Sequence, residues 1–319
     1  MSNKIFLDIS RYIGLFILLY IFFKIDLNEL KNEITGINIL PLLIAMGLNI
    51  PHLFIKSLRW NYLLRQQNIC LTYWETFLPY MSSLYIGFIT PGRVGEFIKA
   101  FYLKTYKGIS LSRGFSSVLI DRLFDLYLLL ILGSIGIWKF DILGKFSDAF
   151  LLLSALVILV PLIMFNKKLV MRMVKILYNF TVLNRIKGEI EGSFEDFFNG
   201  MYQLANLKLL VSVLYTCIGY FMFFIQCYLI VLAMDLSINF VSISLFMAIS
   251  NLISFIPISI SGLGTRDATL IFLFTIIGLK PEIAVSYSFL VFITFFLVSG
   301  LMGAFSMWVK PVFVQSKIA

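Results

Sequence analysis

The fold is decided by long stretches of sequence that contain no charged side chain. Residues Leu209–Met234 read LLVSVLYTCIGYFMFFIQCYLIVLAM, and Ile283–Val309 is uncharged over a similar length. A hydrocarbon core about 30 Å thick is crossed by roughly 20 helical residues. Both stretches are therefore long enough to span a membrane as helices, and we predict an all-α, polytopic membrane protein.

The composition of the whole chain supports this class and excludes several functions. Of the 319 residues, 60% are hydrophobic and 13% are charged, and the mean hydropathy is +0.94. Three cysteines and one histidine, His52, cannot supply a four-ligand N/S metal site, so we expect no metal or other cofactor. His52 is expected to pack near a span end. The net charge of +9 is typical of cytoplasmic Lys and Arg facing anionic lipid, and we expect no nucleic-acid partner.

Uncharged runs predict six complete spans and two interrupted stretches. The interrupted stretches lie around residues 76–104 and 240–280, where glycines and charged residues break an apolar run. We interpret them as re-entrant broken-helix hairpins, with an eight-span bundle as the alternative. The predicted spans are Ile5–Phe23, Ile34–Ile55, Phe115–Trp138, Ala149–Phe165, Leu209–Met234 and Ile283–Val309.

The distribution of Lys and Arg orients these spans. With both termini in the cytoplasm, 17 of the 26 Lys and Arg residues fall in cytoplasmic segments and five fall outside. Lys56, Arg59 and Arg65, which follow the second span, are counted as cytoplasmic. We therefore predict a multi-pass protein of the cell (inner) membrane with both termini cytoplasmic.

Each half of the chain shows the same order of span, span, interrupted hairpin and span. Residues 83–96 (SLYIGFITPGRVGE) resemble residues 254–267 (SFIPISISGLGTRD), because both run from apolar residues through glycine turns to an acid. Three crossings per half is an odd number, so the second half would enter the membrane upside down. We predict an inverted repeat of residues 1–138 and 139–319. A plain bundle with two broken helices is the alternative.

The two breaks are candidate anion sites. Non-helical backbone at membrane depth is tolerated where it is buried in protein or lines a wet cavity. A helix that restarts there points its free N–H groups inward, which favours an anion such as phosphate. Arg93 and Arg266 add full positive charges at the two breaks. The glycines that would allow close backbone approach are Gly92, Gly95, Gly262 and Gly264.

Acidic residues next to these arginines leave two interpretations open. Glu96 and Asp267 each open the helix that follows a break. They pair with Arg93 and Arg266 and simply fix the loops, or they set the electrostatics of a site in which the arginines contact a ligand. The sequence favours ligand contact over pure structural pairing.

The third predicted span carries a second charged cluster. Asp121, Arg122 and Asp125 lie in its first turns, with the two acids four residues apart on one helix face. Two acids against one base leave Asp121 in need of a partner from another helix, and Arg93 or Lys99 is nearest in the sequence. A buried structural network is the preferred interpretation, and a proton relay is the alternative.

These motifs resemble those of a known family. The segments Pro91–Glu96 (PGRVGE), Arg59-Trp60, Asp121–Asp125 (DRLFD) and Gly262–Asp267 (GLGTRD) are similar to the flippase-like transmembrane domain of lysylphosphatidylglycerol synthases, over nearly the whole chain. This chain has Asp267 where family members usually have Glu, which is one methylene longer. The resemblance implies translocation of a polar-headed lipid between leaflets, often an aminoacylated or glycosylated one.

The resemblance also implies that the chain is not an enzyme. Full synthases carry a soluble aminoacyltransferase domain after the membrane part, whereas only about ten residues follow the last predicted span here. We predict a flippase-like transporter of a phosphate-headed (aminoacylated, glycosylated or polyprenyl) lipid. The candidate substrate-binding residues are Arg93, Arg266, Gly92, Gly95, Gly262, Gly264, Glu96, Asp267, Asp121, Arg122 and Asp125.

A polar insertion at residues 166–208 is expected on the cytoplasmic side. Lys168, Arg172 and Lys175 recur at helical spacing and predict an interfacial amphipathic helix. Residues 190–207 are expected to pack under the bundle. The predicted partners are membrane lipids. In the alternative function, the chain is a non-catalytic subunit that presents a lipid-linked substrate to a cytoplasmic glycosyltransferase or aminoacyltransferase, which would dock on this insertion.

Overall fold

The structure is a computed structural model that describes residues 36–90, 92–144, 148, 151–152, 154–155, 187–204, 206–256, 259 and 262–312, without the side chains of residues 187–194. The predicted first span, most of the predicted span 149–165, the predicted amphipathic helix at 168–175 and Pro91 lie outside these residues. Within the described ranges every regular element is helical, as predicted.

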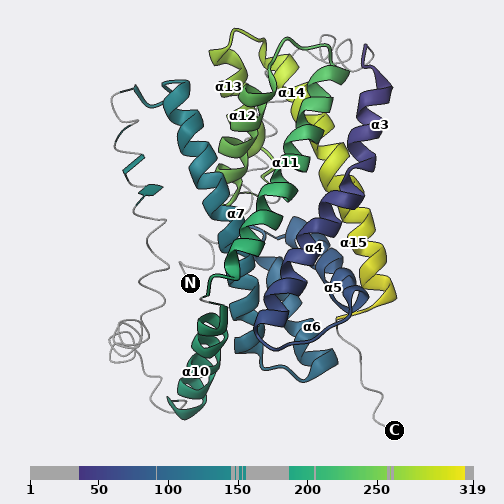
Figure 1. Cartoon of the computed structure of the whole chain (residues 1–319). Coiled ribbons are helices and arrows are strands. Elements are labelled where there is room, and N and C mark those ends of the chain that lie inside the picture. The colour runs from purple at the N-terminus through teal and green to yellow at the C-terminus, as the bar shows by residue number, and fades with distance from the viewer. Residues whose placement is uncertain are drawn as a thin grey trace, which may run out of the picture.

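The helices follow the predicted order of spans and breaks (Figure 1). The helix that carries the DRLFD motif is longer than its predicted span and includes the preceding basic residue Arg113. The elements are α3 (Ile39–Gly47), α4 (Asn49–Gln66), α5 (Tyr73–Phe88), the 3-10 helix η1 (Val94–Phe97), α6 (Ile98–Lys107), α7 (Leu111–Lys139), α10 (Lys187–Leu204), α11 (Leu209–Ala233), α12 (Phe240–Ser254), α13 (Thr265–Ile276), α14 (Pro281–Val291), the π-helical η4 (Phe292–Leu297) and α15 (Val298–Val309).

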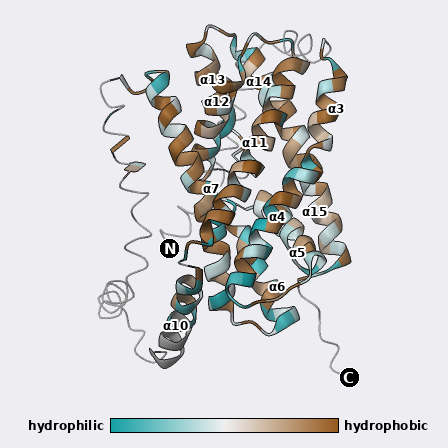
Figure 2. Ribbon diagram, in the orientation of Figure 1, coloured by the Kyte–Doolittle hydropathy of each residue, from teal (hydrophilic) through white to brown (hydrophobic). Residues whose placement is uncertain are grey.

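Within the described ranges, three helical segments are long and apolar enough to cross a membrane. They are Ile39–Gln66, Leu209–Ala233 and Pro281–Val309, and they correspond to the second, fifth and sixth predicted spans. Large apolar side chains such as Leu214 and Phe305 are exposed on them, as expected for a surface that faces lipid. Figure 2 shows hydrophobic residues along most of the bundle, with hydrophilic residues gathered around α5, α6 and α10.

Two helix pairs contain the predicted breaks and lie at opposite ends of the bundle (Figure 1). The first pair is α5 with η1 and α6, and the second is α12 with α13; within each pair the two helices pack against each other. The first break turns through two left-handed residues, Gly92 (φ 58°) and Arg93 (φ 56°). At the second break, the carboxylate of Asp267 accepts the backbone N–H of Gly264 (2.8 Å) and caps the start of α13.

The first break is held tightly against the end of α5. The hydroxyl of Thr90 accepts the backbone N–H of Gly95 at 2.8 Å. A Cβ atom at Gly95 would lie 2.5 Å from the carbonyl oxygen of Ile86, so this glycine is required by close packing. The break is therefore a defined turn whose backbone fixes the direction of the Arg93 side chain.

The sequence predicts that residues 190–207 pack under the bundle, and this packing is confirmed for α10. On α10, Phe198, Met201 and Leu204 are buried, and α10 contacts α7 and α4. Met201 and Leu204 form an apolar cluster with Leu63 of α4 and Ile120 of α7. This contact closes one end of the helices that carry the charged network described next.

Candidate functional site

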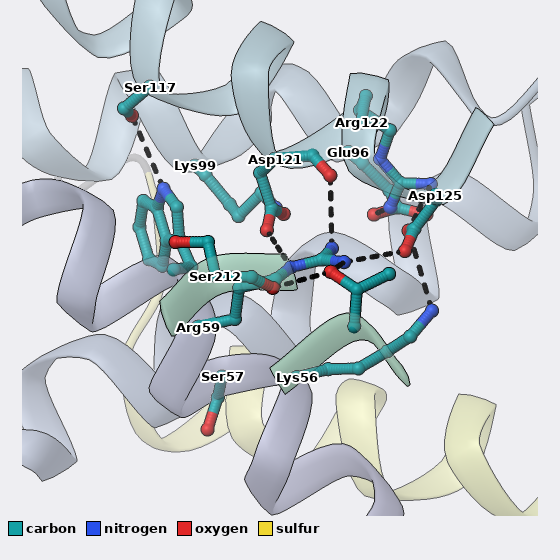
Figure 3. A network of polar contacts seen from close by, with 12 residues as sticks. Lys56, Ser57, Arg59, Glu96, Lys99, Ser117, Asp121, Arg122, Asp125 and Ser212 are labelled. Atoms are coloured by element: carbon teal, nitrogen blue, oxygen red, sulfur yellow. Dashed lines mark hydrogen bonds and ion pairs between the residues drawn. The ribbon is translucent and has the colours of Figure 1, made fainter. Parts of the chain in front are cut away.

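A buried arginine on α4 organises the charged residues of the bundle (Figure 3). Arg59 is 0% exposed. Its Nε donates to Asp121 Oδ1 (2.8 Å), and its Nη1 donates to Asp125 Oδ1 (2.8 Å). Further donations reach the hydroxyl of Thr216 on α11 (3.0 Å) and the backbone carbonyl of Asp121 (3.0 Å). These four hydrogen bonds tie three helices together and compensate the cost of burying the charge.

Two lysines complete the charge balance around these acids. The Nζ atom of Lys99 on α6 lies 2.8 Å from Asp121 Oδ2, and both side chains are fully buried. The Nζ atom of Lys56 lies 3.4 Å from Asp125 Oδ2. The predicted need of Asp121 for an interhelical partner is thus confirmed, with Lys99 as one partner and Arg59 as the second.

Arg122 connects this cluster to the first break. Its guanidinium pairs with Glu96, which is fully buried at the start of the helix after the break. It also lies 4.0 Å from Asp125 within the same helix. The alternative in which Glu96 pairs with Arg93 is wrong, because Glu96 faces α7 and its partner comes from that helix.

The prediction that Lys56 and Arg59 lie in a segment after the end of the second span needs correction. Helix α4 continues past Ile55 to Gln66, and the two residues project into the bundle rather than into a loop. Counting Lys and Arg along the sequence assigns every basic residue after an apolar run to the loop next to the span. The signal that could have found them is their spacing: His52, Lys56 and Arg59 fall at i, i+4 and i+7, on one face of a helix.

A cavity of about 80 Å³ lies beside this network, large enough for several water molecules. Its wall includes residues from both breaks: Gly92 and Arg93 from the first, and Ser254 and Phe255 from the second. Aromatic residues of α11 and η4 supply much of the remaining wall. Both breaks therefore contribute residues to the wall of one cavity.

Arg93 reaches this cavity without an acidic partner in the part of the chain that the structure describes. Its guanidinium carbon lies 5.6 Å from the ring centre of Phe88 and 5.4 Å from that of Phe296. Such cation–π contacts hold a guanidinium more weakly than a buried carboxylate does. The group is thus available to an anion that enters the cavity.

Arg266, the equivalent arginine of the second break, is held in a different way. It is 1% exposed and donates to Asp267 Oδ1 (3.2 Å) and to the hydroxyl of Ser288 on α14 (3.1 Å). Its guanidinium carbon lies 4.9 Å from the ring centre of Phe296. Because Arg93 contacts the same ring, the two guanidinium carbons lie at most about 10 Å apart. The structure therefore brings both arginines to Phe296 but pairs only Arg266 with an acid.

The candidate residues fall into three groups around this centre. Those that line the cavity are Gly92, Arg93, Arg122 and Asp125. Those in the supporting contacts behind it are Glu96, Asp121 and Gly95. Those that build the second break without lining the cavity wall are Gly262, Gly264, Arg266 and Asp267.

His52 is a cavity residue that sequence reasoning did not select. It lies on α4 with 7% of its surface exposed, and its ring is 6.1 Å from that of Phe223. Neither ring nitrogen has a hydrogen-bond partner among the described residues. Buried polar atoms without a partner are rare, so the ring is a candidate for ligand contact. Within the described part of the chain, no three His, Cys, Asp or Glu side chains are grouped to hold a metal ion.

Comparison with known proteins places the chain in a family. The family model described as "Lysylphosphatidylglycerol synthase TM region" matches residues 9–303. The chain belongs to this family. The match covers both breaks, the DRLFD helix and the first half of α15, so the resemblance stated from the motifs is confirmed.

Curated proteins that are similar to this chain include archaeal membrane proteins. A UPF0104 membrane protein of Methanocaldococcus jannaschii is 23% identical over 320 residues, which cover 96% of this chain and 94% of the relative. A UPF0104 membrane protein of Methanothermobacter thermautotrophicus is 24% identical, and the alignment covers 84% of this chain and 81% of the relative. A UPF0104 membrane protein of Pyrococcus horikoshii is 23% identical, and the alignment covers 82% of this chain and 84% of the relative. No solved structure matches the chain. Membership of the lysylphosphatidylglycerol synthase TM family identifies a membrane protein.

Proposed function

We propose that this chain is a flippase-like transporter that moves a phosphate-headed lipid between the two leaflets, without chemical change to the lipid. The observation that carries the proposal is the cavity between the two breaks, which exposes the Arg93 guanidinium without an acidic partner in the described residues. Arg93 would contact the phosphate, and Arg266 with Asp267 would hold the second break in place. The acyl or prenyl chains would stay in the surrounding lipid.

The physical need for such a cavity is the cost of dehydrating a headgroup. A phosphate carried through hydrocarbon loses its hydrogen bonds with water, and the penalty for a charged group is many kcal/mol. The cavity replaces that water with fixed N–H donors and cations at the depth of the breaks. Ion pairs hold two of those cations in place, because Asp125 lies 3.4 Å from Lys56 and Glu96 pairs with Arg122.

The topology that suits this function is the predicted one. Six complete spans with two re-entrant hairpins would bring the breaks in from opposite faces, and both termini would lie in the cytoplasm. Two observations support it: the helix pairs lie at opposite ends of the bundle (Figure 1), and both breaks contribute to one cavity. The membrane lipid itself would be the main partner.

The proposal is tested by lipid movement in vesicles that contain the purified full chain. Acyl-labelled fluorescent phosphatidylglycerol is incorporated, and dithionite added outside destroys the label that reaches the outer leaflet. We expect Arg93→Gln to slow this movement at least about tenfold, and Arg93→Lys to slow it less because the charge is kept. Arg65→Gln is the matched control, since Arg65 is an exposed cation at the end of α4.

Two results would contradict the proposal. One is movement of the label by the folded wild-type chain at the rate of protein-free vesicles. The other is an Arg93→Gln variant that is folded and moves the label as fast as the wild type. If the first result came with co-purification of a cytoplasmic transferase, the chain would instead be a subunit that presents a lipid-linked substrate.

A further inference from the structure

The charges that face the cavity are unequal in number. Among the described lining residues, Lys56, Arg93 and Arg122 are cations, and Asp125 supplies the one carboxylate. That carboxylate is already occupied, because it accepts from Arg59 at 2.8 Å and lies 3.4 Å from Lys56. Arg122 is paired with Glu96 and Lys56 lies near Asp125, so Arg93 is the lining cation without an acidic partner among the described residues. A ligand that enters the cavity therefore meets surplus positive charge, and the described residues of this wall offer it no free acid.

This positive charge lies beside two side chains that can still bind a ligand, Arg93 and His52. Arg93 is held by aromatic rings alone, and His52 has two ring nitrogens without partners in the described residues. His52 is more than nine-tenths buried and precedes Lys56 by one helical turn, so both project from one face of α4 into the same cavity. A neutral imidazole can donate one hydrogen bond to a phosphate oxygen.

We propose that this wall selects headgroups of net negative charge and rejects headgroups whose phosphate is balanced or exceeded by an amine, with His52 as a second phosphate contact beside Arg93. The proposal rests on the proposed lipid movement and names its substrate class. An ammonium or aminoacyl group carried into the cavity would lie near Lys56 and Arg93, and no carboxylate among the described lining residues is free to receive it. Repulsion between like charges is strong where water is scarce.

The chemistry that is recognised is a phosphate anion, and it could come from a lipid or from a free solute. The two sources are separated by the form of the experiment. Vesicles of neutral lipid that contain the full chain receive one labelled lipid at a time: phosphatidylglycerol (net −1), phosphatidylcholine (net 0) or lysylphosphatidylglycerol (net +1). A parallel set of vesicles, without labelled lipid, measures uptake of radiolabelled inorganic phosphate.

We expect phosphatidylglycerol to move at least about tenfold faster than lysylphosphatidylglycerol, with phosphatidylcholine between them. His52→Leu is expected to slow phosphatidylglycerol about three- to tenfold. Phosphatidylcholine should stay within twofold, because a headgroup that the wall rejects does not place its phosphate against His52. This change in the ratio of rates would not follow from a merely structural role, which would slow all lipids alike. Arg65→Gln, the exposed control, leaves the ratio unchanged.

The outcomes separate this proposal from the proposed function. Equal rates for the three lipids, or faster movement of lysylphosphatidylglycerol, would overturn the selectivity while lipid movement stands. A His52→Leu variant with an unchanged ratio would remove His52 from the site. Movement of no lipid would overturn both proposals, and uptake of inorganic phosphate in that case would assign the cavity to a free anion.

Discussion

The buried pair of Asp121 and Lys99 allows a sharp test of the network. Asp121 accepts from Arg59 and from Lys99, each at 2.8 Å, and all three side chains are 0% exposed. The substitution Asp121→Asn keeps the shape and removes the charge. Among the described residues, it leaves the Lys99 ammonium without its paired carboxylate, beside the rings of Trp60 and Tyr80, whose centres lie 5.1 and 4.6 Å away.

The expected loss is large because the remaining charge cannot reach water. Removing one partner of a buried ion pair costs about 3–5 kcal/mol. For a chain of this size, the thermal midpoint would fall by at least about 6 °C. In the double variant Asp121→Asn, Lys99→Met the unpaired ammonium is gone, so the double variant should be more stable than Asp121→Asn alone by about 1–2 kcal/mol.

The assay is thermal unfolding of the purified chain in one detergent, followed by tryptophan fluorescence. Glu75→Gln is the control, because it breaks an ion pair whose side chains are 34–36% exposed and should cost less than about 1 kcal/mol. A midpoint for Asp121→Asn within 1 °C of the wild type would refute the reasoning. So would a double variant less stable than the single one, since Lys99 would then be stabilising without its acid.

Two further predictions concern helix contact and pH. Gly303→Ala should destabilise the chain by about 1–3 kcal/mol, because the added Cβ would lie 2.5 Å from the carbonyl oxygen of Met81 on α5. Gly300→Ala on the same helix is the control, since there is room for its Cβ and the thermal midpoint should change little. The hydrogen bond from Lys107, with a backbone N–H bond at the helix start, lowers the pKa of Glu75 from 4.5 to about 2. Because the pKa of the folded state is the lower one, this stabilisation is present above about pH 4.5 and is lost as the pH falls toward 2. The difference in midpoint between the wild type and Glu75→Gln, measured against pH, should shrink over that range, and a constant difference would contradict the assignment.

Much of the fold was predictable from the sequence because its signals are local. Uncharged runs predicted the segments Leu209–Ala233 and Pro281–Val309 to within a few residues. Glycines predicted both breaks, since the left-handed backbone at Gly92 and the close packing at Gly95 are properties of a short stretch of chain. An unequal count of acids and bases in one helix predicted that Asp121 needs a partner from elsewhere.

The sequence alone therefore determined a helical membrane protein with two broken elements, each carrying an arginine. Only the tertiary structure decided that Arg59 lies in the core, that Arg93 faces the cavity while Arg266 is paired with Asp267, and that His52 lines the same wall. The physical reason is that hydropathy belongs to each residue, whereas charge pairing depends on which helices pack together. Residues that meet there, such as Arg59 and Asp121, are separated by 62 positions in the chain, and no local pattern brings them into contact.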